Sequence, residues 1–132
     1  MKELQQKYVE YQTYEEHLKD LQKQLQQVDE NILEINYIKN SLDEFSQIKE
    51  GKEILCPLSS GIFVKANIRK THEFFVNVGS NVVVGKDLEE TKKLMESQEK
   101  EIEKTRENLN QKYYEVYTRL QNLQQELSRM VD

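Results

Sequence analysis

Apolar residues recur at alternating intervals of three and four along the first third of the chain. Two rows with a spacing of seven interleave there: Leu4, Tyr11, Leu18, Leu25 and Ile32, and Tyr14, Leu21, Val28, Ile35 and Leu42. Interleaved rows of this kind form the seam of a coiled coil. Lys39 interrupts the first row, which indicates a local stutter before the centre of the chain. The pattern predicts a long helix over residues 1–49.

The last third of the chain repeats this period. One row is apolar at every seventh residue: Leu88, Met95, Ile102, Leu109, Val116, Leu123 and Met130. Its companion row is apolar only near the C-terminus and is charged nearer the centre, at Lys92, Glu99 and Arg106. Asp87, followed by Glu90, has the pattern of a helix N-cap with a box-like partner. A second long helix is therefore expected over residues 87–132.

Helix-breaking residues are confined to the centre. The four glycines and the single proline all fall there: Gly51, Pro57, Gly61, Gly79 and Gly85. The flanks avoid penalties of roughly 1 kcal/mol per glycine and 3 per proline, so each can run as one uninterrupted helix. Neither helix can bury its stripe alone. Because the two are nearly equal in length, they are expected to pair as an antiparallel coiled coil with both chain ends at one tip.

The central residues 50–86 have the period of strands. Short β-branched and aromatic runs at 54–58, 62–68, 73–78 and 82–84 are separated by turn residues, which predicts four strands in two hairpins. Isolated hairpins are only marginally stable, so the strands are expected to form an assembly surface. Alternate residues of the second strand share a face, with matches on the third. The expected oligomerisation residues are Ile62, Val64, Phe74, Val76, Val78, Val82 and Val84.

Composition favours an extended protein over a compact globule. Of 132 residues, only 36% are apolar and 33% are charged. The net charge of −5 is spread over both ends, and no basic face is present, which argues against nucleic-acid binding. With Cys56 as the only cysteine, a reducing compartment fits best. No apolar run has the length of a signal or membrane span, so a soluble, cytoplasmic protein without membrane contact is expected.

Candidate catalytic chemistry is absent from the pattern. Gly79 and Gly85-Lys86 resemble a phosphate loop, but five residues separate the glycines and Asp87 stands where Ser or Thr is needed. His17 and His72 have no acidic or cysteine partner at a catalytic or metal-binding spacing, and Cys56 has no identifiable base. We expect no enzyme activity, no cofactor and no metal.

The order of long helix, strand insert and long antiparallel helix resembles the prefoldin family. Residues 53–66 resemble its pattern of apolar strand, proline, small-residue turn and second strand ending near lysine. Residues 76–84, followed by the acidic helix start at Asp87, resemble its second hairpin. Room for two hairpins resembles the alpha class, since the beta class has one shorter hairpin. Cys56 departs from the usual aliphatic residue, but cysteine behaves as a small hydrophobe.

The resemblance implies a fold and a function together. The fold is α with a small β insert: a long antiparallel two-helix coiled coil joined by two β-hairpins. The function is that of an ATP-independent holding chaperone. Two alpha and four prefoldin beta subunits would form a hexamer whose hairpins close into a platform, and unfolded client proteins would be held at the tips and passed to a group II chaperonin.

Tyrosines near the tip have two explanations. Tyr8, Tyr114 and Tyr117 lie beside the seams, where a purely structural hairpin would carry Lys or Glu, so they fit an exposed apolar patch. Packing between the helices explains the tip equally well. The candidate client-binding residues are Leu4, Tyr8, Tyr11, Tyr114, Tyr117, Leu120, Leu127 and Met130. A structural or filament-forming relative that transfers no clients is the alternative function.

Overall fold

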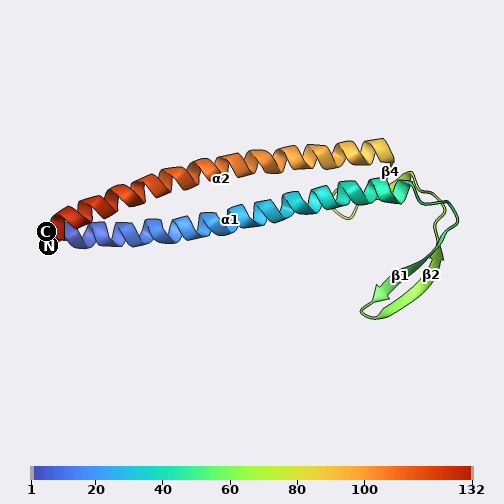
Figure 1. Ribbon diagram of the computed structural model, residues 1–132, viewed down its shortest axis with the longest axis horizontal. Coiled ribbons are helices and arrows are strands. Elements are labelled where there is room, and N and C mark those ends of the chain that lie inside the picture. Colours follow the sequence, from blue (N-terminus) through green and yellow to red (C-terminus); the bar gives the residue numbers. More distant parts are fainter. Residues whose placement is uncertain (1, 132) are drawn as a thin grey trace. The chain divides into compact units, whose positions relative to one another are not determined.

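Two helices, of 45 and 44 residues, come first and last along the chain, and four short strands lie between them in the sequence. The computed structural model describes residues 2–131, so the expected ends at residues 1 and 132 lie outside the described residues. The elements are α1 (Lys2–Ser46), β1 (Glu53–Ser59), β2 (Ile62–Asn67), β3 (Glu73–Asn77), β4 (Val83–Asp87) and α2 (Leu88–Val131) (Figure 1). The predicted fold class, two long helices joined by two β-hairpins, is confirmed.

The chain divides into two structural units. The first pairs residues 2–33 of α1 with residues 100–131 of α2, and the second is Glu34–Glu99, which holds the strands and the adjoining turns of both helices.

The core of the first unit is the seam that the sequence rows predict. Leu21 and Val28 of α1 pack with Leu109 and Val116 of α2, and all four are buried. Half-buried residues from both helices flank this core: Tyr14, Leu18, Leu25, Ile32, Ile102 and Tyr113. Leu123 has an exposed fraction of 0%. The two apolar stripes therefore bury each other, and the first turns of α1 lie beside the last turns of α2 (Figure 1).

Charged residues that interrupt the apolar row of α2 have partners on α1. The N···O distances of the three ion pairs are 2.5 Å for Lys92 with Asp43, 3.1 Å for Lys39 with Glu99 and 3.1 Å for Arg106 with Asp29. The hydrogen bond to Asp43 raises the pKa of Lys92. Lys39, which interrupts the apolar row on α1, thus pairs with Glu99, which interrupts the apolar row on α2. Because such charges meet in only one alignment of the helices, they help to specify the register of the pair.

α1 ends and α2 begins beside the strand insert, and hydrogen bonds mark both positions. α1 ends at Ser46 rather than at residue 49, because the N–H groups of Gln47 and Ile48 bond three residues back, at 3.2 and 3.1 Å, and tighten the last turn. Gly51, at φ 87°, then turns the chain. At the start of α2, Asp87 Oδ1 accepts a 2.8 Å hydrogen bond from the Glu90 N–H. The predicted N-cap is confirmed.

The strands form two separate antiparallel ribbons, β1 with β2 and β3 with β4. In the first ribbon, the register shifts between Pro57 and Ser59. In the second, Gly79, Ser80 and Asn81 all have positive φ and make the loop. β4 begins at Val83, so Val82 belongs to the loop rather than to the fourth strand, and its N–H bonds to Gly79 O at 2.9 Å.

Truncating the buried seam should destabilise the helix pair. Leu123→Ala is expected to lower the free energy of unfolding by about 2 to 5 kcal/mol, because it leaves a cavity in a fully buried position. Leu33→Ala is the matched control. Leu33 has an exposed fraction of 69%, and its truncation should cost within about 0.5 kcal/mol. Urea denaturation at one fixed chain concentration measures both, and equal losses would contradict the proposed seam.

Candidate functional site

The strand ribbons carry a large share of the exposed apolar side chains. They are Ile54, Leu55, Leu58, Ile62, Phe63, Val64, Phe75, Val78, Val82, Val83 and Val84. Each ribbon has only two strands, so both of its outer edges present unpaired backbone N–H and C=O groups. Exposed apolar surface next to unpaired strand edges is what a β-mediated interface needs.

The structure distributes the seven candidate oligomerisation residues over both ribbons. Ile62, Val64, Val78, Val82 and Val84 are exposed, whereas Phe74 and Val76 are half-buried on one face of β3. Whether these side chains make subunit contacts stays a prediction.

Sequence reasoning missed the opposite face of the ribbons. Leu55, Phe63, Phe75 and Val83 lie there and are also exposed. The signal was present in the unbroken apolar runs of the strands. Such runs are typical of strands buried on both faces, whereas a strand with one solvated face alternates. Both faces of each ribbon are therefore candidates for contact with a partner.

A groove lies where the first turns of α1 meet the last turns of α2. We call it the terminal groove, and it is an open depression of about 590 Å³ lined by Leu4, Gln5, Tyr8, Val9, Leu127 and Val131. All but Gln5 are apolar or aromatic. The groove brings together Leu4, Tyr8 and Leu127 of the candidate client-binding residues. Val9 and Val131 were missed, because both lie outside the heptad rows.

The other candidate client-binding residues lie elsewhere. Tyr11 and Leu120 are half-buried, and Met130 is exposed beyond the lining of the terminal groove. Tyr114 and Tyr117 line a second depression of about 660 Å³, here called the tyrosine groove, with Gln22, Leu25, Gln26, Asp29, Asn110 and Tyr113. The eight candidates thus divide among the two grooves, two half-buried positions and the exposed Met130.

The tyrosine groove has ordered aromatic and amide groups. The rings of Tyr113 and Tyr117 stack with centroids 6.2 Å apart and an interplanar angle of 9°. Gln22 Nε2 donates to the Tyr113 hydroxyl at 3.2 Å, and Gln121 Nε2 donates to the Tyr117 hydroxyl at 2.8 Å. These bonds hold two of the three tyrosines in place, while Tyr114 has an exposed fraction of 70%.

Two ion pairs join the helices beside the terminal groove. Lys7 Nζ lies 2.9 Å from Glu126 Oε2, and Arg119 Nη2 lies 3.0 Å from Glu10 Oε1. The hydrogen bond from Lys7 lowers the pKa of Glu126, and the hydrogen bond to Glu10 raises the pKa of Arg119. The groove is thus an apolar depression in a charged, ion-paired surface.

Within residues 2–131, no helix is long and apolar enough to cross a membrane. Nor do these residues contain a cluster of three metal-binding side chains. Cys56 is a free, exposed thiol on β1.

The fold is a coiled-coil helix pair whose connecting ribbons expose apolar side chains on both faces. The prefoldin subunit family model matches residues 14–132, and the chain belongs to this family. Two relatives are named prefoldin subunit alpha. The Thermofilum pendens protein is 29% identical over 87% of this chain and 89% of its own length, and the Archaeoglobus fulgidus protein is 30% identical over 96% and 93%. The predicted resemblance to the alpha class is confirmed.

A solved structure agrees with these sequence matches. A chain of filamentous PFD from Methanocaldococcus jannaschii, determined by cryo-electron microscopy, superposes with a TM-score of 0.78 at 25% sequence identity. The match covers 87% of this chain and 95% of that chain.

Removing the carboxylate of Glu126 should produce a pH-dependent loss of stability. Because Lys7 lowers the folded-state pKa of Glu126, the stabilisation is present above the ordinary glutamate pKa of about 4.3 and is lost as the pH falls through the folded-state value. Glu126→Gln should therefore unfold at a lower urea concentration than the wild type at neutral pH. The gap should narrow as the pH falls below the ordinary glutamate pKa of about 4.3.

Urea midpoints measured by circular dichroism between neutral pH and about pH 3 test this expectation. Glu103→Gln is the control, since Glu103 is exposed and has no ion pair within residues 2–131. A gap that persists unchanged at the acidic end would contradict the role of the Lys7 contact.

Proposed function

We propose that the chain is the alpha-class subunit of an ATP-independent holding chaperone, which binds non-native polypeptides at the end of the helix pair where α1 begins and α2 ends. Membership of the prefoldin family supports a chaperone role. The terminal groove is the observation that supports client binding there, because it offers apolar side chains from both helices in an open depression.

The chemistry of the terminal groove suits weak and unselective binding. Aliphatic side chains and Tyr8 contact apolar segments of many sequences, and the open form of the groove imposes no fixed shape on a client. Nearby Met130 adds a flexible, polarisable side chain. A single groove of this size binds weakly. Several arms acting together raise the avidity without any new contact.

Assembly supplies those several arms. In the proposal, the exposed ribbons pair with prefoldin beta subunits, and two alpha and four beta subunits form the hexamer. Residues 1–132 act as one prefoldin-like domain, in which α1 and α2 flank an oligomerisation insert at 50–86. Unpaired edges and apolar faces on both ribbons support a role of the insert in assembly.

We also propose that the subunit delivers its clients to a group II chaperonin, lies in the cytoplasm and catalyses no reaction. Holding and release need only apolar contacts of moderate strength, so no ATPase is required. The relatives named prefoldin subunit alpha support these assignments through the family.

A structural filament former is the second candidate function. It is favoured by the similarity to the filamentous PFD of Methanocaldococcus jannaschii. In that case the same ribbons would join identical chains end to end, and no client would be transferred. Light scattering after size-exclusion separates a closed hexamer from open polymers, with the chain alone and mixed with a beta-class subunit.

Charge placed on the ribbons should prevent assembly. Val76→Asp and Val82→Asp are expected to abolish the complex with a beta-class subunit, because each would bury an unpaired carboxylate in an apolar interface. Ser60→Asp, in the exposed turn between β1 and β2, is the control and should assemble normally. Size-exclusion with light scattering gives the mass, and an unchanged hexamer mass for both valine variants would contradict the role of the ribbons.

Polar substitutions in the terminal groove should weaken holding without affecting assembly. Tyr8→Ser combined with Val131→Ser removes one apolar contact from each helix. A loss of roughly 1.5 kcal/mol per arm corresponds to about a tenfold higher subunit concentration for equal suppression of aggregation. Light scattering of a chemically unfolded enzyme diluted into buffer measures it. Leu33→Ser, on an exposed leucine outside the groove, is the control, and equal suppression by both variants would contradict client binding there.

A further inference from the structure

The tyrosine groove and the terminal groove lie on the same side of the helix pair. Both belong to the unit that pairs residues 2–33 with residues 100–131. On α1, Leu25 of the tyrosine groove follows Leu4 of the terminal groove by three intervals of seven residues, and on α2, Tyr117 precedes Val131 by two such intervals. Residues at intervals of seven keep the same side of a coiled coil. At about 1.5 Å per residue, the two grooves are roughly 20 to 30 Å apart, so one extended polypeptide can reach both.

The linings of the two grooves differ in chemistry. The terminal groove is lined by aliphatic side chains together with Tyr8 and Gln5. The tyrosine groove is lined by three tyrosine hydroxyls, three side-chain amides and the carboxylate of Asp29, with Leu25 as its aliphatic residue. An aliphatic segment laid over these polar groups would separate them from water without offering hydrogen bonds. The tyrosine groove therefore suits a segment that brings a polar or charged side chain.

An exposed tyrosine ring and a carboxylate line the tyrosine groove from opposite helices. Tyr114 is exposed and lies outside both heptad rows of α2, so the pairing of the helices does not require it. Asp29, on α1, pairs with Arg106, but its side chain is 51% exposed. A carboxylate can accept about four hydrogen bonds, so this pair leaves capacity for a second donor. A guanidinium group stacks on aromatic rings and bonds to carboxylate and amide oxygens, and the lining therefore favours an arginine side chain.

The charges of the tyrosine groove also favour a cation. Among the described residues that line it, Asp29 alone is charged. Glu103 and Glu107 are exposed and precede two lining residues of α2 by one interval of seven, and neither forms an ion pair within residues 2–131. They add negative charge near the end of the groove where Asp29 lies. A cationic side chain is complementary to these carboxylates, whereas an anionic one would be repelled.

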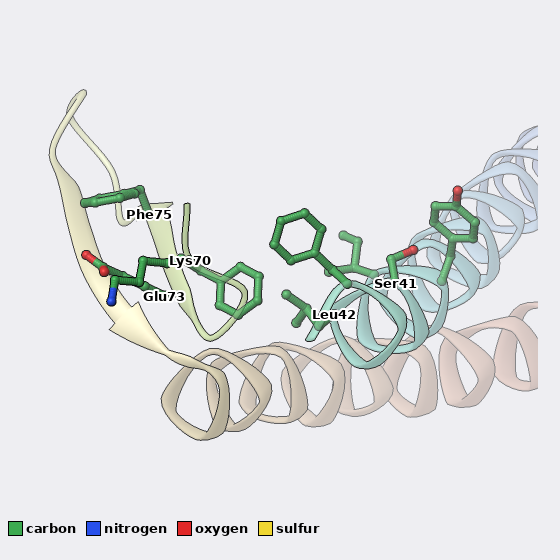
Figure 2. Close-up of a pocket in the computed structure, with 9 residues that line it drawn as sticks. Ser41, Leu42, Lys70, Glu73 and Phe75 are labelled. Carbon is green, nitrogen blue, oxygen red and sulfur yellow. The ribbon is translucent and has the colours of Figure 1, made fainter. Parts of the chain in front are cut away.

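A third depression, of about 420 Å³, is a poorer site for an arginine side chain. It lies within Glu34–Glu99 and is lined by residues of α1, of β3 and of the segment before β3. Figure 2 shows Ser41 and Leu42 on α1 facing the segment that carries Lys70, Glu73 and Phe75 across it. Lys70 already places a cation in this lining, which would repel a second one. Tyr37 lines the same depression and is 74% exposed, so it offers a control for Tyr114.

We propose that the tyrosine groove is a second client subsite, which binds an arginine side chain of the same non-native polypeptide whose apolar segment occupies the terminal groove. This inference rests on the proposed client binding at the terminal groove. The guanidinium stacks on the ring of Tyr114 and bonds to the carboxylate of Asp29. Because the grooves are roughly 20 to 30 Å apart, about six to nine extended residues separate the arginine from the apolar segment. The subunit therefore prefers a client with arginine at this distance over one that is only apolar.

Four fluorescently labelled peptides test the second subsite. Each has three leucines at one end, a flexible spacer of glycine and serine, and either arginine or glutamine at the other end. A spacer of about twelve residues can span roughly 40 Å and reaches from one groove to the other, whereas a spacer of about two residues spans roughly 7 Å and does not. Fluorescence anisotropy, with the full chain as titrant, gives the dissociation constant of each peptide. The ratio of the glutamine to the arginine value measures what the arginine contributes.

The ratio should be about fivefold for the long peptides and less than about twofold for the short ones, because only the long peptides bring arginine to the ring and the carboxylate. Tyr114→Ser and Asp29→Asn should each reduce the ratio of the long peptides to less than about twofold. The binding of the glutamine peptides should not change in either variant.

Two control variants match these changes outside the tyrosine groove. Tyr37→Ser removes an equally exposed tyrosine, and Glu30→Gln removes one negative charge next to Asp29 but outside the lining. Both should keep a ratio of about fivefold. All four substituted side chains are exposed, and circular dichroism checks that each variant is folded. If Asp29→Asn weakens the helix pair through loss of the Arg106 contact, Tyr114→Ser against Tyr37→Ser decides alone.

The outcomes separate this inference from the proposed function. The second subsite is wrong if long and short peptides give the same ratio, or if Glu30→Gln lowers the ratio as much as Asp29→Asn, which would indicate only general attraction by negative charge. It is also wrong if Tyr114→Ser changes the mass of the complex with a beta-class subunit, because the groove would then be a subunit contact. If Tyr8→Ser with Val131→Ser leaves the binding of the glutamine peptides unchanged, client binding at the terminal groove itself fails, and the second subsite fails with it.

Discussion

Burial of the apolar seam between α1 and α2 is the constraint on which the rest of this structure depends. Each helix has an apolar stripe that water would otherwise cover, and Leu21, Val28, Leu109 and Val116 become buried only by facing one another. Antiparallel pairing follows, since one chain supplies both helices. It sets Leu4 beside Val131 and so creates the terminal groove. It also confines the glycines and the proline to the connection.

The strands of that connection cannot bury their apolar side chains within the chain in the same way. A ribbon of two strands leaves two edges and two faces without cover, and the continuous apolar runs of β1 to β4 show that neither face is designed for water. The helix seam is thus completed within the chain, whereas the strands need surface from another molecule. This difference explains why a chain with only 36% apolar residues still exposes Leu55, Phe63 and Phe75.

The sequence predicted the features that depend on neighbours along the chain. Heptad rows located the seam, breakers bounded the insert, and Asp87 with Glu90 marked the start of α2. Features that depend on which residues of the two helices face each other were not predicted. Spacing within one helix does not say that Lys39 meets Glu99, or that Tyr114 lies with Gln26 in one groove while Tyr8 lies in another. Predicting these contacts requires the register in which the two helices pair.

The charged interruptions of the seam help to align the two helices, whereas the apolar end of the seam holds them together. Within Glu34–Glu99, the ion pair between Lys39 and Glu99 replaces apolar contacts and contributes mainly to alignment, since partly exposed pairs add little stability. In the other unit, both rows of α2 are apolar towards the C-terminus, and burial supplies the adhesion. Val9 and Val131 are exposed outside both rows, so pairing does not require them. Apolar side chains that the fold does not need are the ones free to contact another polypeptide.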